Sequence, residues 1–233
     1  MSRFAVVLLD VDGTLVHAGG AGRRSIERAL EARCGPHDGA LRALRLDGMT
    51  DRLIVREAMA LLDHPWSDAA CDGVLAEYLE HLRAEIDGPG YAVLPGVVAL
   101  LEELAARAVP HGLCTGNLEE GARLKLARGG LDRFFEWGPT AIGGFAHDGE
   151  ARDQIVEAAL RRTAARLGWA IAPADALVVG DTPRDVEAAH AVGCQALAVA
   201  TGRFSLDELA AAGADHLAPD LGDPAALRLM LGA

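Results

Sequence analysis

The sequence predicts an α/β protein with a doubly wound parallel sheet and an inserted helical domain. Two observations predict the sheet: short apolar segments rich in valine and leucine recur along the chain, and each is followed by a segment with a helical pattern. Continuous apolar runs of this length are typical of strands buried on both faces of a parallel sheet. The third observation is a long stretch, residues 17–91, in which this alternation stops.

The expected strands differ in how clearly they are marked. Residues 4–9 form an unbroken apolar run, and residues 176–181 and 195–200 repeat the pattern. The run at 109–114 is weaker, because a proline and a histidine interrupt it. Proline or glycine marks several ends of the helical segments that follow the strands. These helices are expected at 96–107, 118–128, 152–167, 183–191 and 206–212.

Residues 17–91 read as a helical insert with no convincing strand. Glycines at 19–22 and a glycine- and proline-rich stretch at 88–96 lie at its two ends, where we expect hinges. The sequence therefore predicts a core domain made of residues 1–16 and 92–233 and a cap-like domain made of residues 17–91. Helical patterns within the insert cover 24–33, 52–62 and 69–86.

Composition narrows the class of protein. The chain has 233 residues, of which 51% are hydrophobic and 24% charged, as in an ordinary soluble globular protein. Its formal net charge of −12 opposes nonspecific binding to nucleic acid or to anionic lipid, because both are polyanions. We therefore expect neither a nucleic acid nor a membrane as a partner. An acidic protein can still bind a small phosphate locally.

The cysteines and the N-terminal run bear on location. The four cysteines lie far apart without a CxxC pair, which argues against a zinc site and against a disulfide framework. The first apolar run ends at Asp10, so it is too short to span a membrane, and no small-residue cleavage site follows it. A cytoplasmic protein is the simplest expectation. The sequence does not indicate an oligomeric state.

The most informative segment is Asp10-Val11-Asp12-Gly13-Thr14-Leu15, directly after the first expected strand. Two aspartates separated by one residue point in different directions, and the glycine lets the backbone approach a bound anion. Ligands of open α/β sheets bind at the carboxyl ends of the strands. A strand-end turn or a helix cap is the alternative interpretation of such a pair, so its context decides.

Two other segments lie in matching places, after an apolar run and before a helix. Thr115, Gly116 and Asn117 offer a hydroxyl, an amide and backbone N–H groups that could hold phosphoryl oxygens. Ordinary helix capping by Thr115 or Asn117 is the alternative. Asp181 and Asp185 place two carboxylates one helical turn apart at another strand end. There the alternative is capping of the following helix by Asp181 or the adjacent threonine.

Together these residues resemble the haloacid dehalogenase (HAD) superfamily over nearly the whole chain. DVDGTL at 10–15 matches the first motif, Thr115 the second, and GDTPRD at 180–185 the fourth. The insert resembles the cap of the phosphoglycolate-phosphatase-like branch, and Gly48-Met49-Thr50-Asp51 resembles that branch's cap pattern. The resemblance implies a Rossmann-like HAD core with an inserted helical cap.

The resemblance also implies a mechanism. Asp10 would attack phosphorus and form an aspartyl-phosphate, and Asp12 would protonate the leaving oxygen and then activate water. A hard oxygen-ligand site suits Mg²⁺. The implied metal site consists of Asp10, the Asp12 backbone carbonyl and Asp181, with Asp185 bound directly or through water. The implied phosphate-binding residues are Gly13, Thr115, Gly116 and Asn117.

The superfamily's third motif is where this sequence departs from the usual pattern. No Lys-Pro pair precedes the helix expected at 152–167, and Arg152 occupies about that place. Lys125, on the helix after Thr115, is the other candidate for the catalytic cation, and either residue could equally be a surface charge. We expect both to lie near the site.

A phosphatase acting on a small phosphorylated metabolite is the leading hypothesis, with phosphoglycolate among the candidate substrates. Superfamily dehalogenases lack the second aspartate, so Asp12 disfavours that activity. Phosphonate-cleaving relatives use a cap lysine, and residues 17–91 contain no lysine. A phosphosugar mutase and a noncatalytic binding module are the alternatives. Thr50, Asp51 and Arg52 are the best substrate-contacting candidates in the cap, by analogy with the fold.

Overall fold

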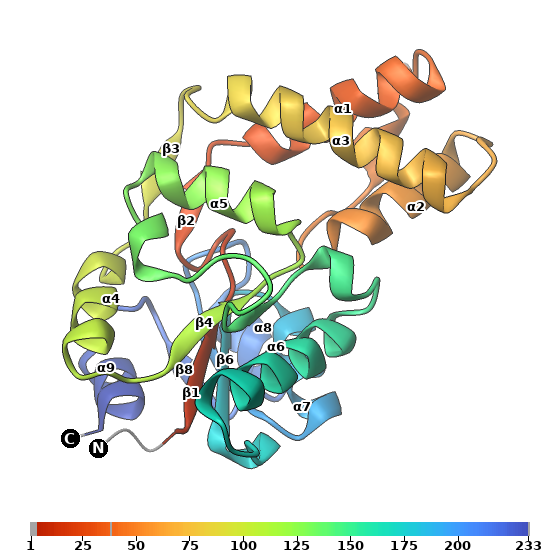
Figure 1. Ribbon diagram of the computed structural model, residues 1–233. Coiled ribbons are helices and arrows are strands. Elements are labelled where there is room, and N and C mark those ends of the chain that lie inside the picture. The colour runs from red at the N-terminus through yellow and green to blue at the C-terminus, as the bar shows by residue number, and fades with distance from the viewer. Residues whose placement is uncertain (1–3, 38, 233) are drawn as a thin grey trace.

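A computed structural model describes residues 4–37 and 39–232. Six parallel strands form one sheet in the order β5-β4-β1-β6-β7-β8, with helices on both faces and the helical insert above its carboxyl edge (Figure 1). This is the doubly wound α/β fold that the sequence predicts. The strands are β1 (Val6–Leu9), β4 (His111–Cys114), β5 (Gly143–Gly144), β6 (Ala176–Gly180), β7 (Gln195–Val199) and β8 (His216–Ala218).

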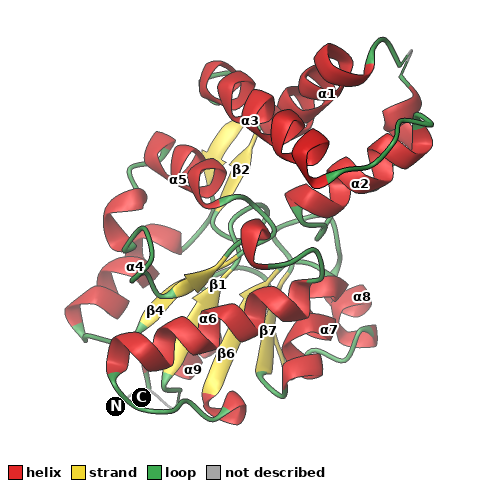
Figure 2. Cartoon of the chain, turned by 45° about the vertical axis from the view of Figure 1, so that its right-hand side comes forward, coloured by secondary structure: helices red, strands yellow, loops and turns green. Residues whose placement is uncertain are grey.

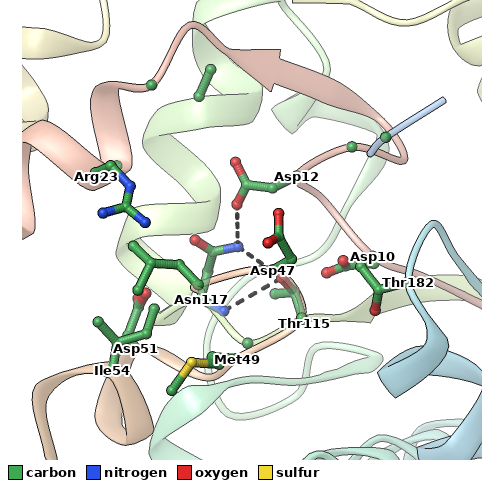
Figure 3. A pocket seen from close by; sticks show the side chains of 18 of the residues that line it. Asp10, Asp12, Arg23, Asp47, Met49, Asp51, Ile54, Thr115, Asn117 and Thr182 are labelled. Carbon is green, nitrogen blue, oxygen red and sulfur yellow. Dashed lines mark hydrogen bonds between the residues drawn. The ribbon is translucent and has the colours of Figure 1, made fainter. Parts of the chain in front are cut away.

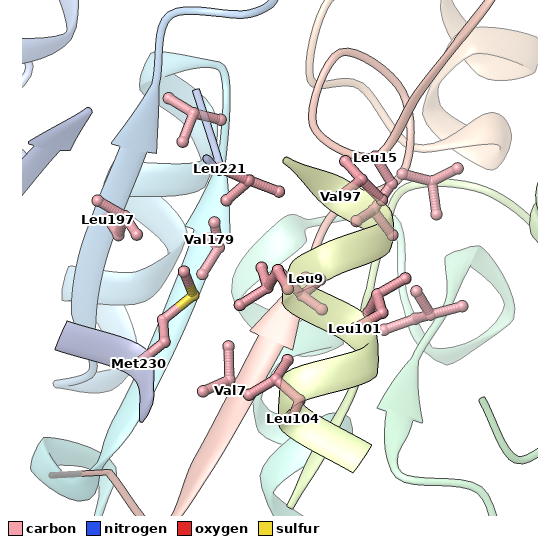
Figure 4. Packing of buried hydrophobic residues seen from close by; sticks show 14 of the residues in the cluster. Val7, Leu9, Leu15, Val97, Leu101, Leu104, Val179, Leu197, Leu221 and Met230 are labelled. Carbon is pink, nitrogen blue, oxygen red and sulfur yellow. The ribbon is translucent and has the colours of Figure 1, made fainter. Parts of the chain in front are cut away.

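Alternating side chains of β1 pack in two separate hydrophobic layers. Val6 and Leu8 face the helices seen in front of the sheet in Figure 2, and all four residues of the strand are buried. Val7 and Leu9 face the opposite layer, where Leu101 and Met230 meet them (Figure 4). Burial on both faces explains why β1 reads as a continuous apolar run.

The helices divide between the two faces. The layer around Val6 and Leu8 contains α6 (Arg152–Leu167), α7 (Pro183–Val192) and α8 (Leu206–Ala211). The layer around Val7 and Leu9 contains α4 (Val97–Ala106), α5 (Glu119–Arg128) and α9 (Pro224–Leu231). Five of these helices begin and end within one residue of the sequence expectation. The sixth, α9, was not predicted.

The insert has a hydrophobic core of its own. Its helices are α1 (Ala21–Cys34), α2 (Asp51–Leu61) and α3 (Asp68–Glu85). All three were expected from the sequence, although α1 begins three residues earlier than expected. Tyr78 is the largest fully buried side chain and lies in this second core. Leu118 and Leu124 of the sheet domain pack against the same cluster, so the α5 segment is one place where the two domains meet. The short helices are η1 (Ala40–Ala43), η2 (Asp132–Phe134), η3 (Ala146–Asp148) and η4 (Pro173–Asp175).

The prediction that residues 17–91 contain no strand is wrong at both ends. β2 (Val16–Ala18) pairs antiparallel with β3 (Tyr91–Val93), and the two make a ribbon that joins insert and sheet domain. Each strand has only three residues, which is too short for a period-two pattern to be recognised. Each of the expected domain boundaries, 16/17 and 91/92, falls inside one strand of this ribbon.

The sheet's two edge strands were also missed. β5 consists of two glycines, and β8 has three residues that are not an apolar run. An edge strand has one neighbour and less apolar cover, so its sequence carries a weaker signal. No helix in the described part of the chain is both long and apolar enough to cross a membrane.

Candidate active site

The predicted motifs meet at the carboxyl edge of the sheet, under the cap. A cavity of about 970 Å³ opens there between the two domains (Figure 3). Parallel strands present their carboxyl ends at one edge, which is why segments far apart in the sequence converge. The predicted residues that line the cavity are Asp10, Asp12, Gly13, Asp51, Thr115, Gly116, Asn117, Lys125, Arg152 and Asp181.

A tight turn after β1 places the two aspartates of the first motif. The Asp10 N–H donates to the Val179 carbonyl, which ties the end of β1 to β6. Gly13 then adopts a φ of 79°, and a Cβ on it would lie 2.3 Å from Asp181 Oδ2. Only glycine allows both that backbone conformation and this close approach. The turn therefore brings the first and fourth motifs into contact.

Asp10, Asp181 and Asp185 form a buried acidic cluster. One carboxylate oxygen of each lies within 4.8 Å of the others, and the three residues are 5%, 5% and 3% exposed. Burial raises the pKa of Asp10 to about 6, with Arg152 opposing the rise. Burial also raises the pKa of Asp181 to about 9, and the neighbouring carboxylates of Asp185 and Asp10 add to the rise. The cluster is therefore deficient in positive charge.

Arg152 is the positively charged side chain that contacts this cluster. Its guanidinium forms an ion pair with Asp185 and lies 3.4 Å from Asp10 Oδ2. Burial disfavours the charged guanidinium, but Asp185 and Asp10 more than offset this and hold the pKa of Arg152 above its ordinary value. Arg152 begins α6, so the start of this helix delivers the charge to the nucleophile's side of the cavity.

The cluster fits a divalent cation. Three ionised carboxylates and one guanidinium leave two uncompensated negative charges, and oxygen donors are what Mg²⁺ prefers. Within the described residues Asp181 takes part in no ion pair and accepts only a long hydrogen bond from Thr14, at 3.4 Å. Gly13 and Gly202 leave room around it, because a Cβ on either would overlap its carboxylate. Asp181 is thus the carboxylate most available to a metal.

Asp185 has less capacity for a metal than Asp181. Its Oδ2 accepts from the Thr182 N–H at 3.0 Å and from the Thr182 hydroxyl at 2.7 Å, and its Oδ1 contacts Arg152. Thr182 caps α7, as the alternative interpretation of this segment held, and Asp185 completes the capping box. Asp185 therefore orients Arg152 with one oxygen and fixes the start of α7 with the other.

Asp12 belongs to a second polar group, on the cap side of the cavity. Asn117 Nδ2 donates to Asp12 Oδ2 at 2.9 Å and to Thr115 Oγ1 at 2.8 Å (Figure 3). Lys125 Nζ donates to the same Asp12 oxygen at 2.5 Å and to Asn117 Oδ1 at 2.6 Å. The Asp12 side chain is 44% exposed, so water reaches it, whereas the lysine side chain is 5% exposed.

The two candidate cations therefore have different partners: Arg152 faces Asp10 and Lys125 faces Asp12. Lys125 is the only lysine of the chain, beside 21 arginines. An ammonium group is compact and has three donors, which suits the narrow space between Asp12 and Asn117 better than a planar guanidinium would. The use of a single lysine in a chain with 21 arginines is a sequence feature that indicates a specific role for Lys125.

Of the three cap candidates, the structure brings one into the cavity. Asp51 lines it and is 6% exposed. Thr50 is buried and its hydroxyl donates to the Glu150 carbonyl, while Arg52 forms ion pairs with Asp68 and Asp72 at 3.0 and 2.8 Å. These three consecutive residues point in different directions because α2 begins among them. Thr50 and Arg52 are not among the residues that line the cavity, so a substrate contact by either stays a prediction that this geometry does not support.

The loop after β7 was not identified from the sequence. Thr201 donates its hydroxyl hydrogen to the Gly13 carbonyl at 2.6 Å, and a Cβ on Gly202 would lie 1.7 Å from Asp181 Oδ2. Their position could have identified them, because Thr201 and Gly202 directly follow an apolar run, as the other motifs do. Thr115 and Asn117 do not cap α5, which begins after Leu118.

Comparisons with known proteins identify relatives of this chain. Residues 4–193 match the family model of the haloacid dehalogenase-like hydrolases. The chain is 34% identical over 214 residues to the phosphoglycolate phosphatase of Rhodospirillum rubrum, covering 89% of this chain and 84% of that protein. It is 32% identical over 170 residues to the phosphoglycolate phosphatase of Synechococcus elongatus, covering 72% and 70%.

A solved structure shows the same fold. The crystal structure of a predicted phosphoglycolate phosphatase from Haemophilus somnus superimposes with a TM-score of 0.66 at 20% identity, covering 96% of this chain and 97% of that one. The match of the family model to most of the chain, together with the relatives above 30% identity, establishes the family. The chain belongs to the haloacid dehalogenase-like hydrolase family.

Proposed function

We propose that the protein is a Mg²⁺-dependent phosphatase that hydrolyses a small phosphate monoester through an aspartyl-phosphate on Asp10. The observation that carries the proposal is the difference between the environments of two carboxylates that follow β1. Asp10 lies among buried carboxylates and Arg152, whereas Asp12, two residues on, lies in a separate polar group that water reaches. A nucleophile and an acid/base need these two different environments.

In the first step, an Asp10 oxygen bonds to phosphorus and the bond from phosphorus to the ester oxygen breaks. The leaving oxygen takes a proton from Asp12, so that an alcohol departs. Arg152 holds the Asp10 carboxylate in place, and the Thr115 hydroxyl and the N–H groups of Gly116 and Asn117 hold the transferring group. Phosphoryl transfer depends mainly on such positioning and on charge stabilisation.

In the second step, Asp12 takes a proton from water, and the water oxygen attacks phosphorus. Inorganic phosphate leaves and the Asp10 carboxylate is restored. The exposure of Asp12 gives water access to it, and the bonds from Asn117 and Lys125 fix its orientation. This access favours hydrolysis over transfer to a second hydroxyl.

Asp10, Asp181 and the Asp12 backbone carbonyl would hold the Mg²⁺, with Asp185 at its edge. When bound, the ion reduces the repulsion between a carboxylate nucleophile and a phosphate dianion. With all three carboxylates ionised, Arg152 alone leaves two negative charges in the cluster, and these would repel a phosphate dianion.

Phosphoglycolate is the first substrate to test, because the two curated relatives described above carry that activity in their names. It is a small phosphate ester, and the cavity of about 970 Å³ is large enough to hold it. A panel of phosphorylated metabolites compared by kcat/KM would rank it against sugar phosphates.

The proposal is tested by release of phosphate from p-nitrophenyl phosphate and from phosphoglycolate, with Mg²⁺ or with a chelator. We expect activity only with the metal, and none in the D10N variant. Acid quenching during turnover should trap a phosphoryl group on Asp10 that mass spectrometry locates. Activity in D10N equal to that of the wild type would refute the nucleophile. Conversion of a hexose phosphate to an isomer without free phosphate would replace phosphatase by mutase.

A further inference from the structure

The cap touches the catalytic loops through its backbone. A Cβ on Gly116 would lie 2.4 Å from the Met49 carbonyl oxygen, and a Cβ on Gly48 would lie 2.6 Å from Thr182 Oγ1. The Asp51 N–H donates to the Gly116 carbonyl at 2.7 Å. The segment at the start of α2 is therefore seated on the loops that follow β4 and β6.

Asp51 adds a side-chain bond to the same loop. Its Oδ2 accepts from the Leu118 N–H at 2.8 Å. One cap residue thus holds both sides of Asn117, through the Gly116 carbonyl and through the Leu118 amide. Figure 3 shows Asp51 on the cap side of the cavity, below Asn117.

This bond replaces a missing helix cap. The first N–H groups of a helix have no partner within it, and a nearby side chain usually accepts from one of them. Leu118 is the N-cap of α5 and has no side chain that can serve. Asp51 supplies the acceptor from the other domain. The helix that it stabilises carries Lys125, and the loop before it carries Asn117.

The charge on Asp51 is compatible with this role. Burial raises the pKa of its carboxyl to about 6, whereas Lys125 and the Leu118 amide lower it. Asp12 and Tyr78 are the other ionisable groups that face it, from the turn after β1 and from α3. A buried carboxylate is stable only where a hydrogen bond and a cation compensate for lost water, and both are present.

We propose that Asp51 is a positioning residue. Its carboxylate holds residues 116–118 in the geometry that aims Asn117 and Lys125 at Asp12, and it does so only while the cap lies on the sheet domain. The catalytic cluster is therefore completed by the cap rather than by the sheet domain alone. This role rests on the phosphatase function proposed above, and it differs from a substrate contact, since Asp51 acts through the loop.

The test compares Asp51→Ala with Asp51→Asn, because the amide oxygen of asparagine can still accept from Leu118. We expect D51A to lower kcat on p-nitrophenyl phosphate about ten- to a hundredfold with KM changed less than about threefold, as loss of a charge-assisted bond implies. D51N should recover kcat to within about fivefold of the wild type. Asp72→Ala is the matched control, an exposed cap carboxylate paired with Arg52.

A substrate contact would behave differently. It would raise KM for phosphoglycolate and leave kcat on p-nitrophenyl phosphate unchanged, and that outcome overturns the proposal, as does an equal loss in D51A and D51N. Leu118→Pro is the second variant, for the case that D51A does not fold. It removes the donor at a residue whose φ of −59° already suits proline, and it should reproduce the loss of kcat.

Amide hydrogen exchange separates this proposal from the proposed function. The Leu118 amide should exchange faster in D51A than in the wild type, and the Asp72→Ala control should leave it unchanged. Unchanged exchange at Leu118 in D51A would refute the positioning role. An inactive wild-type protein would instead refute the phosphatase, whatever the exchange data show.

Discussion

The Lys125→Met substitution tests the interpretation of the site most directly. It removes a buried ammonium that lies 2.5 Å from Asp12 and 2.6 Å from Asn117, and it keeps the apolar stem of the side chain. Asn117 Oδ1 then loses its donor, and the remaining bond from Asn117 alone orients Asp12. We expect the Asp12 carboxylate to sample unproductive positions.

The magnitude follows from the number and kind of bonds. A hydrogen bond to a charged group contributes about 1.5–3 kcal/mol. The Asp12 side chain is 44% exposed, so solvent screens this pair and the lower half of that range applies. A loss of about 1.5–2.2 kcal/mol corresponds to a roughly thirteen- to fortyfold decrease in kcat/KM. Lys125→Arg should recover little of it, because a guanidinium is too broad for the space that the ammonium fills.

The assay is steady-state hydrolysis of p-nitrophenyl phosphate at saturating Mg²⁺, with thermal unfolding to verify the fold. Arg123→Met is the control, since Arg123 is an exposed cation on the same helix, stacked near Trp137. It should keep kcat/KM within about twofold of the wild type. If K125M stays within about threefold, Lys125 has no part in orienting Asp12.

Three further outcomes are expected. Arg152→Ala should lower the free energy of unfolding by about 3–5 kcal/mol in the presence of a chelator, because it leaves Asp10 and Asp185 buried without their cation; a urea titration that shows less than about 1 kcal/mol would contradict this. Folding raises the pKa of Asp10 to about 6 and of Asp181 to about 9, above the unfolded value of about 3.9. The metal-free protein should therefore lose stability as pH rises from about 4 to about 9, and Mg²⁺ should raise Tm more at pH 8 than at pH 5. An equal rise in Tm at the two pH values would contradict the metal assignment. Gly202→Ala should weaken Mg²⁺ binding at least about tenfold in calorimetry, because its Cβ would displace the Asp181 carboxylate, whereas Gly73→Ala in the cap should bind normally.

Much of the site could be predicted because it follows from local pattern. The apolar run of β1 ends at Asp10, that of β4 before Thr115, and that of β6 before Asp181. Strands buried on both faces leave a continuous apolar signal, and a parallel sheet aligns their carboxyl ends. The resemblance to the superfamily then gave these residues expected roles. The same reasoning failed for β5 and β8, whose two and three residues carry no apolar run.

The tertiary structure decided which partner each functional side chain has. Both Lys125 and Arg152 were candidates for one cation, and only packing shows that the first faces Asp12 and the second Asp10. Residues adjacent in sequence also have different partners: the Asp51 carboxylate accepts from the Leu118 N–H, whereas Arg52 pairs with carboxylates on α3.

The sequence by itself determined the four central strands of the sheet, the helical insert and the strand ends at which the chemistry lies, because these depend on periodicity and on residues close together in the chain. Only the tertiary structure decided that the cap completes the cluster around Asp12 and that glycines on two loops make room for Asp181. Those contacts join residues far apart in the chain. The contact between Asp51 and Leu118 depends on how two separate hydrophobic cores pack against one helix, α5.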